Sequence, residues 1–170
     1  CDLLRRNKEL NKFWWLKVIE AGLGAAEGIC TFNVGIPGME VYSSIGAIRH
    51  HNADKAMFKR TDIQVYDGDK WFLENNISQI HFMKADIEGG EHGLLKGMEE
   101  MFKNGRVSCL LIEISEETLS AFNRKPLDIL IFLHNFDYKW FKLMPYGRLC
   151  SLSTFDKIDD GMYVAIYERD

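Results

Sequence analysis

The sequence predicts an α/β fold, and three observations carry this prediction. The mostly apolar residues 80–87 are typical of a buried strand, and residues 94–102 repeat apolar side chains at the spacing of one helix face. Residues 107–114 form a second continuous apolar run, and a helix pattern begins at Pro126. Strands that alternate with helices in this order are typical of α/β domains rather than of bundles or sandwiches.

The composition is that of an ordinary globular domain. A chain of 170 residues that is 46% hydrophobic can bury a proper core, so we expect a single domain over residues 1–170. The net charge of -4 gives no electrostatic footprint for nucleic acid. No apolar run is long enough to span a bilayer, and no signal peptide opens the sequence. The four scattered cysteines suit a reducing compartment, so we expect a cytoplasmic protein.

Short elements are predicted before the central strand. Residues 2–11 look like a helix that Asp2 can cap, and residues 70–75 look like a turn of helix. Three strands are predicted in the same part of the chain, at residues 13–19, 28–34 and 61–66.

The glycines at positions 22, 24 and 28 imitate a glycine-rich nucleotide loop. Such a loop needs a helix directly behind it, because the helix amino terminus holds the ligand. The residues from Gly28 onward alternate like a strand instead. A turn between two strands is therefore the better interpretation of these glycines.

After the central strand, the helix pattern is expected to stop at Asn104-Gly105, since glycine favours the position that follows a helix. Two strand patterns close the chain, at residues 138–144 and 161–168, with a loop through Pro145 and Gly147 between them.

Carboxylates gather where predicted strands end. Asp86, Glu88 and Glu91 lie between the central strand and its helix, and Glu113 occupies the end of the next strand. Ligands bind at this edge of open α/β sheets. Asp86 is best explained by function, because an acid on an apolar strand costs desolvation free energy unless it has partners or faces a cleft. Glu88 could instead cap free amides and Glu91 could complement the helix dipole, so both interpretations stay open for these two.

Residues 83–91, with Leu94-Leu95-Lys96-Gly97 shortly after, resemble the signature of FkbM-type methyltransferases. That signature is an apolar-Lys-x-Asp-x-Glu-Gly-x-Glu block followed by Leu-Lys-Gly. Further stretches resemble other parts of the family in the same order: residues 4–11, 18–28, 43–44, 69–73 and 111–114. The resemblance therefore covers nearly the whole chain.

The resemblance implies a Rossmann-like class I methyltransferase sheet that binds S-adenosylmethionine. It also implies that the first two strands of that sheet, with the glycine-rich loop and the ribose-binding acid, lie upstream of Cys1. The chain would then be the C-terminal two-thirds of the domain, inactive by itself and without measurable cofactor binding. The strand at 80–87 would be left with an unpaired edge, which residues 13–34 would need to cover in a stable fragment.

The family resemblance implies methyl transfer to a hydroxyl of a sugar, a polyketide or a similar small molecule or glycan. Asp86 is the expected base, or the residue that orients the acceptor hydroxyl. Glu88, Glu91 and Glu113 would bind substrate hydroxyls. Clustered carboxylates also suit Mg²⁺ or Ca²⁺, but nothing in the sequence requires a metal.

The same resemblance implies contacts to the cofactor from Ala21, Gly22 and Asp86, and contacts to the acceptor from Ser43 and Ser44. A hypothesis from a different class is a non-catalytic methyltransferase-like binding module or an inactive fragment. It rests on Ala21-Gly22, which stand where many class I enzymes have an acid beside the adenine.

Overall fold

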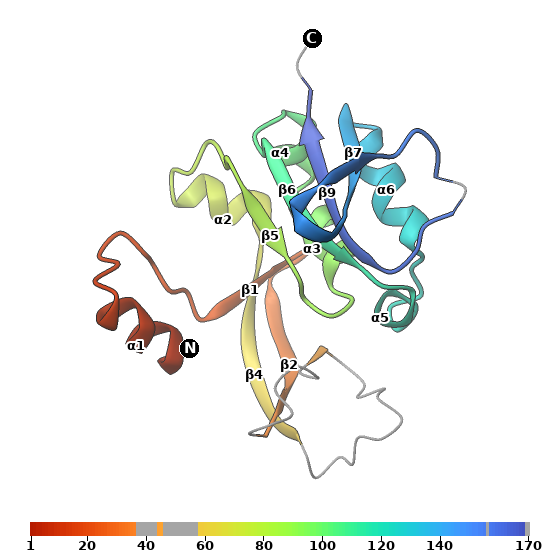
Figure 1. Cartoon of the computed structure of the whole chain (residues 1–170). Helices are drawn as coiled ribbons and strands as arrows, with labels where there is room; N and C mark the ends of the chain where they lie inside the picture. The colour runs from red at the N-terminus through yellow and green to blue at the C-terminus, as the bar shows by residue number, and fades with distance from the viewer. Residues whose placement is uncertain (37–43, 46–57, 156, 169–170) are drawn as a thin grey trace.

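The computed structural model describes residues 1–36, 44–45, 58–155 and 157–168 (Figure 1). The α/β class predicted from the sequence is confirmed, with the strands of the described residues divided between two sheets. One sheet has four strands in the order β1-β4-β2-β3, and the other has five in the order β5-β6-β9-β7-β8.

The four-stranded sheet is built around the long strand β4. Its strands are β1 (Ala21–Gly24), β2 (Gly28–Gly35), β3 (Ser44–Ile45) and β4 (Phe58–Asp67). β1 runs parallel to β4 on one side, and β2 runs antiparallel to it on the other. The strands predicted at 28–34 and 61–66 are confirmed. Gly22 and Gly24 lie within β1 rather than in a turn, and Gly28 begins β2; the chain passes from strand to strand, as predicted, and not into a helix.

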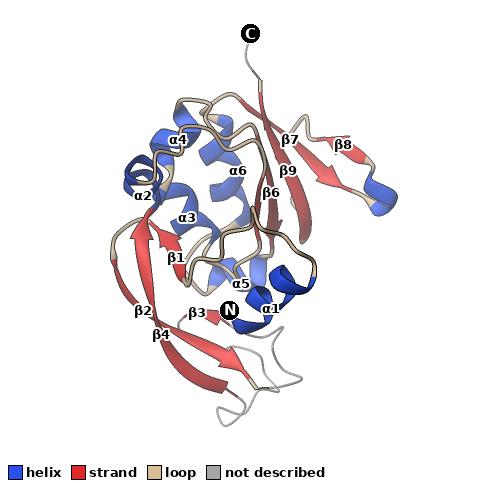
Figure 2. Cartoon of the chain, turned by 90° about the vertical axis from the view of Figure 1, so that its left-hand side faces the viewer, coloured by secondary structure: helices blue, strands red, loops and turns tan. Residues whose placement is uncertain are grey.

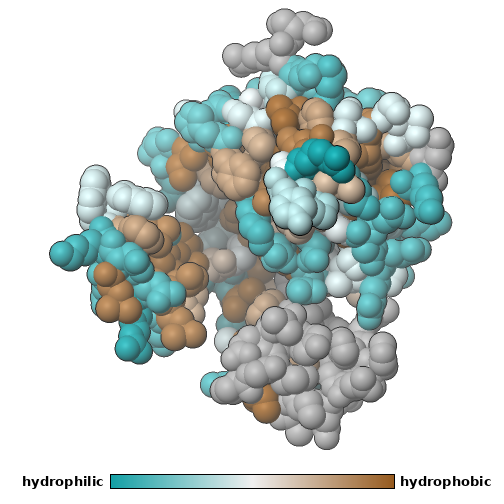
Figure 3. Space-filling view, viewed as in Figure 1, coloured by the Kyte–Doolittle hydropathy of each residue, from teal (hydrophilic) through white to brown (hydrophobic). Residues whose placement is uncertain are grey.

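The strand predicted at residues 13–19 is wrong. These residues form turns and extended chain, and the strand begins only at Ala21. Trp14 and Trp15 are 85% and 64% exposed, so their aromatic side chains have no sheet surface to pack against. The apolar side chains of this stretch gather with those of α1 (Asp2–Leu10) on a lobe at the left of Figure 3. Asp2 is the first residue of that helix and makes no cap bond, contrary to prediction.

The strand predicted at residues 80–87 is much shorter in the structure, where only three of its residues form a strand, and this strand lies at the edge of the five-stranded sheet. The strands of this sheet are β5 (Met83–Ala85), β6 (Cys109–Ile114), β7 (Tyr138–Leu143), β8 (Leu149–Ser151) and β9 (Gly161–Tyr167). β5 runs parallel to β6, and the other neighbours in the sheet are antiparallel. The strands predicted at the end of the chain are confirmed, and β8 forms within the predicted loop between them.

Helices cover one face of this sheet (Figures 1 and 2). The helices after α1 are α2 (Gly68–Glu74), α3 (Glu91–Gly97), α4 (Glu99–Lys103), α5 (Glu116–Ser120) and α6 (Pro126–His134). The single helix predicted before Asn104-Gly105 is two helices, because the backbone breaks at Met98. α5 was not predicted from the sequence. None of the helices in the described ranges has the length and apolarity that crossing a membrane requires.

The side chains of β6 alternate between a buried face and a half-open face. Leu110, Ile112 and Ile114 are fully buried against the helices, whereas Leu111 and Glu113 on the other face are only partly covered. A continuous apolar run such as residues 107–114 predicts a strand covered on both faces, whereas the structure covers only one face of β6 completely. Glu113 therefore lies on the less covered face of the sheet.

Asp69 joins α2 to α4. Its two carboxylate oxygens accept hydrogen bonds from the backbone N–H groups of Glu100 and Met101, both at 2.9 Å. These amides lie in the first turn of α4 and have no partner within the helix, so a carboxylate satisfies and stabilises them. Asp69, which precedes the strand of the family signature (residues 83–91), thus has a structural role.

Two glycines, Gly97 and Gly68, allow α3 to lie very close to its neighbours. A side-chain carbon at Gly97, the last residue of α3, would collide with the backbone carbonyl of Gly24 at the end of β1. A side-chain carbon at Gly68 would lie 2.7 Å from the carbonyl oxygen of Gly97 and 2.5 Å from a carbon of Met98. Only glycine allows backbones to approach this closely, so α3 rests directly on β1.

Candidate active site

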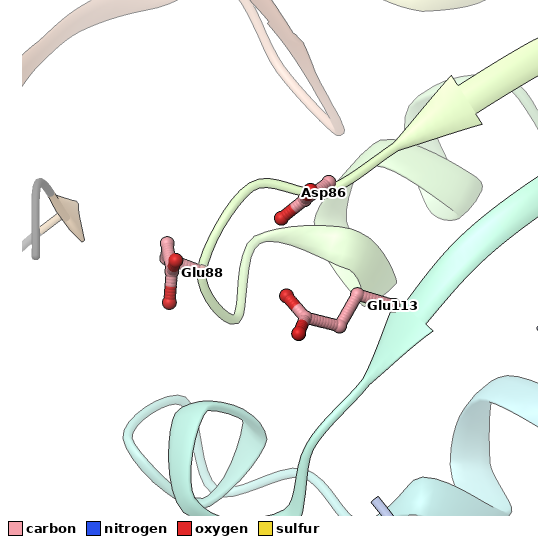
Figure 4. A group of neighbouring side chains, drawn as sticks. All are labelled: Asp86, Glu88 and Glu113. Carbon is pink, nitrogen blue, oxygen red and sulfur yellow. The ribbon is translucent and has the colours of Figure 1, made fainter. Parts of the chain in front are cut away.

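Parallel pairing brings Asp86 beside Glu113. Ala85 pairs with Ile112 across β5 and β6, so the next residues along each strand, Asp86 and Glu113, come together where the strands end. Asp86, Glu88 and Glu113 each offer a carboxylate oxygen, and these oxygens lie within 4.8 Å of one another (Figure 4). We call these three residues the acidic cluster.

A tight turn brings Glu88 into the acidic cluster. Glu88 and Gly89 both have positive φ angles, of 55° and 99°. A non-glycine residue in this conformation costs about 1 kcal/mol or more, which the surrounding structure must offset. The turn packs closely on α5, because a side-chain carbon at Gly89 would lie 2.5 Å from the carbonyl oxygen of Thr118. The two residues after Ile87 therefore hold a conformation that the sequence pattern alone did not predict.

Glu91 supports this turn from beneath. Its side chain is 2% exposed, and one carboxylate oxygen accepts a hydrogen bond of 3.0 Å from the backbone N–H of Ile87. The second carboxylate oxygen is buried without a hydrogen-bond partner. Burial raises the pKa of Glu91, which favours its neutral form. Glu91 thus reaches back from the first turn of α3 to the backbone between Asp86 and Glu88.

The carboxyl groups of the acidic cluster differ in how firmly they hold a proton. Lys84 Nζ lies 2.6 Å from Asp86 Oδ2, and this hydrogen bond holds the pKa of Asp86 below its ordinary value. Burial, a hydrogen bond with Asp86 and repulsion from nearby carboxylates raise the pKa of Glu113 to about 7. Burial and the charge of Asp86 also raise the pKa of Glu88. Asp86 is therefore the charged member, and Glu113 holds a proton near neutral pH.

Three carboxylate oxygens at this spacing could also surround a divalent cation. Oxygen ligands suit Mg²⁺ and Ca²⁺. Acidic side chains gather in the same way without any metal, so their proximity by itself assigns no ion to this place.

A groove of about 500 Å³ lies between the four-stranded sheet and the turn that carries Glu88. We call it the glycine-lined groove. Its walls include Gly22 and Gly28 from the strands, Gly90 and Gly93 from the turn and α3, and Phe122 and Arg124 beyond α5. Side-chain carbons at Gly28 or Gly93 would meet no atom within 4 Å, so these glycines leave open space along the wall. A ligand could approach the backbone closely there.

The family comparison identifies the chain. The model of the methyltransferase FkbM domain matches residues 5–140. This stretch includes β1 and β2, which line the groove, and β5 and β6, which carry the acidic cluster. The chain belongs to the FkbM methyltransferase family. No curated protein and no solved structure gives a significant match.

The FkbM family is a family of methyltransferases, so the resemblance of residues 83–91 to its signature is confirmed, and the chain is a methyltransferase at the family level. Within that signature the structure brings Asp86 and Glu88 together with Glu113, whereas Glu91 lies buried under the turn.

The remaining site residues expected for this FkbM domain lie elsewhere. Gly22 lines the glycine-lined groove, and Ala21 precedes it at the start of β1. Ser43 lies outside the described residues. The backbone of Ser44 pairs with Asn33 as part of β3.

Sequence reasoning on the FkbM domain assigned no role to Lys84, Arg124 or His92. Lys84 carried a usable signal, because residues two apart on a strand point to the same face, and Asp86 follows it at that spacing. Arg124 and His92 reach the groove from segments that lie far apart from Gly22 in the sequence. No local pattern marks them.

Proposed function

We propose that this FkbM-family protein transfers the methyl group of S-adenosylmethionine to a hydroxyl oxygen of a small-molecule or glycan acceptor. The observation that carries the proposal is the pair of unlike carboxyl groups, Asp86 and Glu113, at the ends of adjacent parallel strands. Ligands bind at this edge of α/β sheets. An alcohol gains nucleophilicity from a base, which contributes roughly 100–10,000-fold to such reactions.

The glycine-lined groove fits the nucleoside part of the cofactor. Its size is within the range of small-molecule sites, and its open glycine wall would admit a flat ring close to the backbone. Gly22 and Ala21 would hold that part of the molecule, and Asp86 would face its sulfonium end. The bound cofactor supplies an electrophilic methyl group on a positively charged sulfur. The charged Asp86 carboxylate favours that positive charge in its neighbourhood.

We further propose that the five-stranded sheet is part of a Rossmann-like class I sheet within a single domain over residues 1–170. The parallel pairing of β5 with β6 and the acids at their ends support this arrangement. The direct contact between Gly97 and Gly24 supports one domain rather than two, since no linker separates the sheets there. The free state of all four cysteines supports a cytoplasmic location.

A non-catalytic binding module is the second candidate function. It is favoured by the glycines at 22–28, which lead into β2 and therefore form no phosphate-binding loop before a helix. Such a module would keep the acidic cluster as a surface and would transfer no methyl group.

Calorimetric titration of S-adenosylmethionine tests the cofactor proposal. The titration is run on residues 1–170 and on a chain extended at its N-terminus, because we propose that part of the cofactor site lies upstream of Cys1; binding is expected in the extended chain and not in residues 1–170. In the extended chain, Gly28→Leu should fill the groove and weaken binding at least tenfold, whereas Cys150→Leu, at an exposed position of β8 that is not among the groove's lining residues, should not. Absence of binding to the extended wild-type chain would contradict the proposed function and favour the binding module.

A further inference from the structure

We propose that Glu113 accepts the proton of the acceptor hydroxyl, and that Asp86 is a charged residue that positions it. This assignment rests on the proposed function, because it names the proton acceptor of that methyl transfer. It reverses the roles that the sequence suggested, where Asp86 was the expected base.

Asp86 is already engaged by a cation. Its Oδ2 atom accepts a hydrogen bond of 2.6 Å from Lys84 Nζ, and both side chains are more than one-third exposed. A carboxylate that is stabilised by an ammonium and by water is a weak base, because proton transfer would give up both interactions. Asp86 is thus well suited to remain charged throughout the reaction.

Glu113 has the opposite surroundings. It is half-buried on the open face of the sheet, its carboxyl group hydrogen-bonds to Asp86, and the charges of Asp86, Glu88 and Glu91 all act on it. Lys84 reaches the cluster through Asp86. Burial and negative neighbours both favour the protonated form of Glu113, and its pKa of about 7 lies where a general base works best near neutral pH.

Glu91 gives a second, independent indication that polar groups act at the acidic cluster. Its side chain is almost fully buried, reaches back to the turn between Asp86 and Glu88, and keeps one oxygen without a hydrogen-bond partner. A buried polar atom without a partner is costly and uncommon. When Glu91 is ionised, its charge raises the pKa of Glu88 and of Glu113.

The chemical step balances with these groups. The acceptor oxygen forms a bond to the methyl carbon while the carbon–sulfur bond breaks, and the electron pair of that bond goes to sulfur. The hydroxyl proton moves to the carboxylate of Glu113. The protonated Glu113 then donates a hydrogen bond to the Asp86 carboxylate until the proton passes to water.

Carbon-13 NMR of the side-chain carboxyl groups tests the proton assignment without any substrate. In the wild-type chain, Glu113 should titrate near pH 7 and Asp86 below its ordinary range. Asp86→Asn should move the titration of Glu113 to lower pH by removing its closest negative partner, and Glu117→Gln, an exposed acid on α5, should leave it unchanged. Titration of Glu113 at an ordinary carboxyl value would overturn the proposal.

The pH profile of methyl transfer tests the catalytic role. The N-terminally extended chain is the enzyme, S-adenosylmethionine and a panel of methyl glycosides are the probes, and formation of the demethylated cofactor is the readout. Glu113→Gln should lower kcat at least 100-fold and abolish the rise in rate through pH 7, whereas Asp86→Asn should keep that rise and shift it to lower pH.

Three outcomes would overturn the assignment. The first is a rise in rate that survives in Glu113→Gln and disappears in Asp86→Asn, which would make Asp86 the base. The second is a wild-type activity that a chelator removes and Mg²⁺ restores, with no rise through pH 7, which would make Glu113 a metal ligand. The third is a wild-type protein that binds S-adenosylmethionine but methylates no acceptor. In that case the proposed function and the base fall together, while the NMR titration still decides where the shared proton lies.

Discussion

Lys84 and Asp86, separated by one residue, point to the same face of the sheet, and their side chains meet at 2.6 Å where β5 ends. The spacing follows from the two-residue repeat of a strand. It gives the Lys-x-Asp part of the family signature a physical meaning, because the lysine keeps the aspartate charged beside Glu113, which tends to be protonated.

Replacing Lys84 by Met should raise the pKa of Asp86 towards its ordinary value. A carboxyl group with a lowered pKa stabilises the fold above its unfolded-state pKa, and that contribution is lost as the pH falls through the folded-state value. Both side chains are substantially exposed, so the loss at pH 7 should be under about 1 kcal/mol. Urea denaturation at pH 7 and at pH 2 measures it, with Lys12→Met as control. A stability difference of equal size at both pH values would contradict the ion-pair explanation.

Glu113→Gln should stabilise the protein at alkaline pH. The pKa of Glu113 is about 7 in the folded protein, above its ordinary value, so the folded state binds more protons between those two values. Wild-type stability from this group should therefore fall as the pH rises through 7, and the variant should lack that fall. The gain at pH 8 should be about 1 kcal/mol, well below the full linkage value, because the side chain is only half-buried. Thermal melts between pH 5 and pH 8 should show the two curves diverging as the pH rises, and parallel curves would refute the shift.

Gly97→Ala should destabilise the fold by about 3 kcal/mol or more, because the added carbon meets a backbone carbonyl that cannot change rotamer. Gly93→Ala is the matched control on the same helix, since its added carbon meets open space. The control should be neutral or stabilise by about 0.5–1 kcal/mol through helix propensity. Guanidinium denaturation measures the free energy of unfolding of both variants. Equal changes in the two variants would mean that the close approach of α3 to β1 is not rigid.

Asp69→Ala should cost about 1–2 kcal/mol, because two amides in the first turn of α4 lose their acceptor. Glu74→Ala, an exposed acid on α2, should change stability by less than about 0.5 kcal/mol. Cofactor affinity, measured per folded molecule, should be the same in both variants. A loss of affinity in Asp69→Ala at unchanged stability would place Asp69 in the binding site instead.

Local patterns were enough to predict most of the elements around the site. The apolar run of β6, Pro126 at the start of α6 and the final strands all follow from rules that act over a few residues, whereas the run at 80–87 forms only the short edge strand β5. The division into two sheets could not be predicted in this way, because it depends on which distant strands pair. The residues around Trp14 illustrate the limit, since a good strand composition forms no strand where no partner strand is available.

The site was predictable to a similar extent. Acids at the ends of two successive strands predicted that Asp86 and Glu113 would share one edge, and they do. The distribution of the proton between them was not predictable, because it depends on burial and on the distance to Lys84. The burial of Glu91 depends likewise on a turn whose conformation is set by its packing against α5.

The contact of Gly97 with Gly24 also bears on how such a chain can diverge. Because this contact joins backbone atoms, most side chains near it can change while α3 keeps its position on β1. The groove and the acidic cluster can therefore keep the same relative position in sequences that differ widely around them.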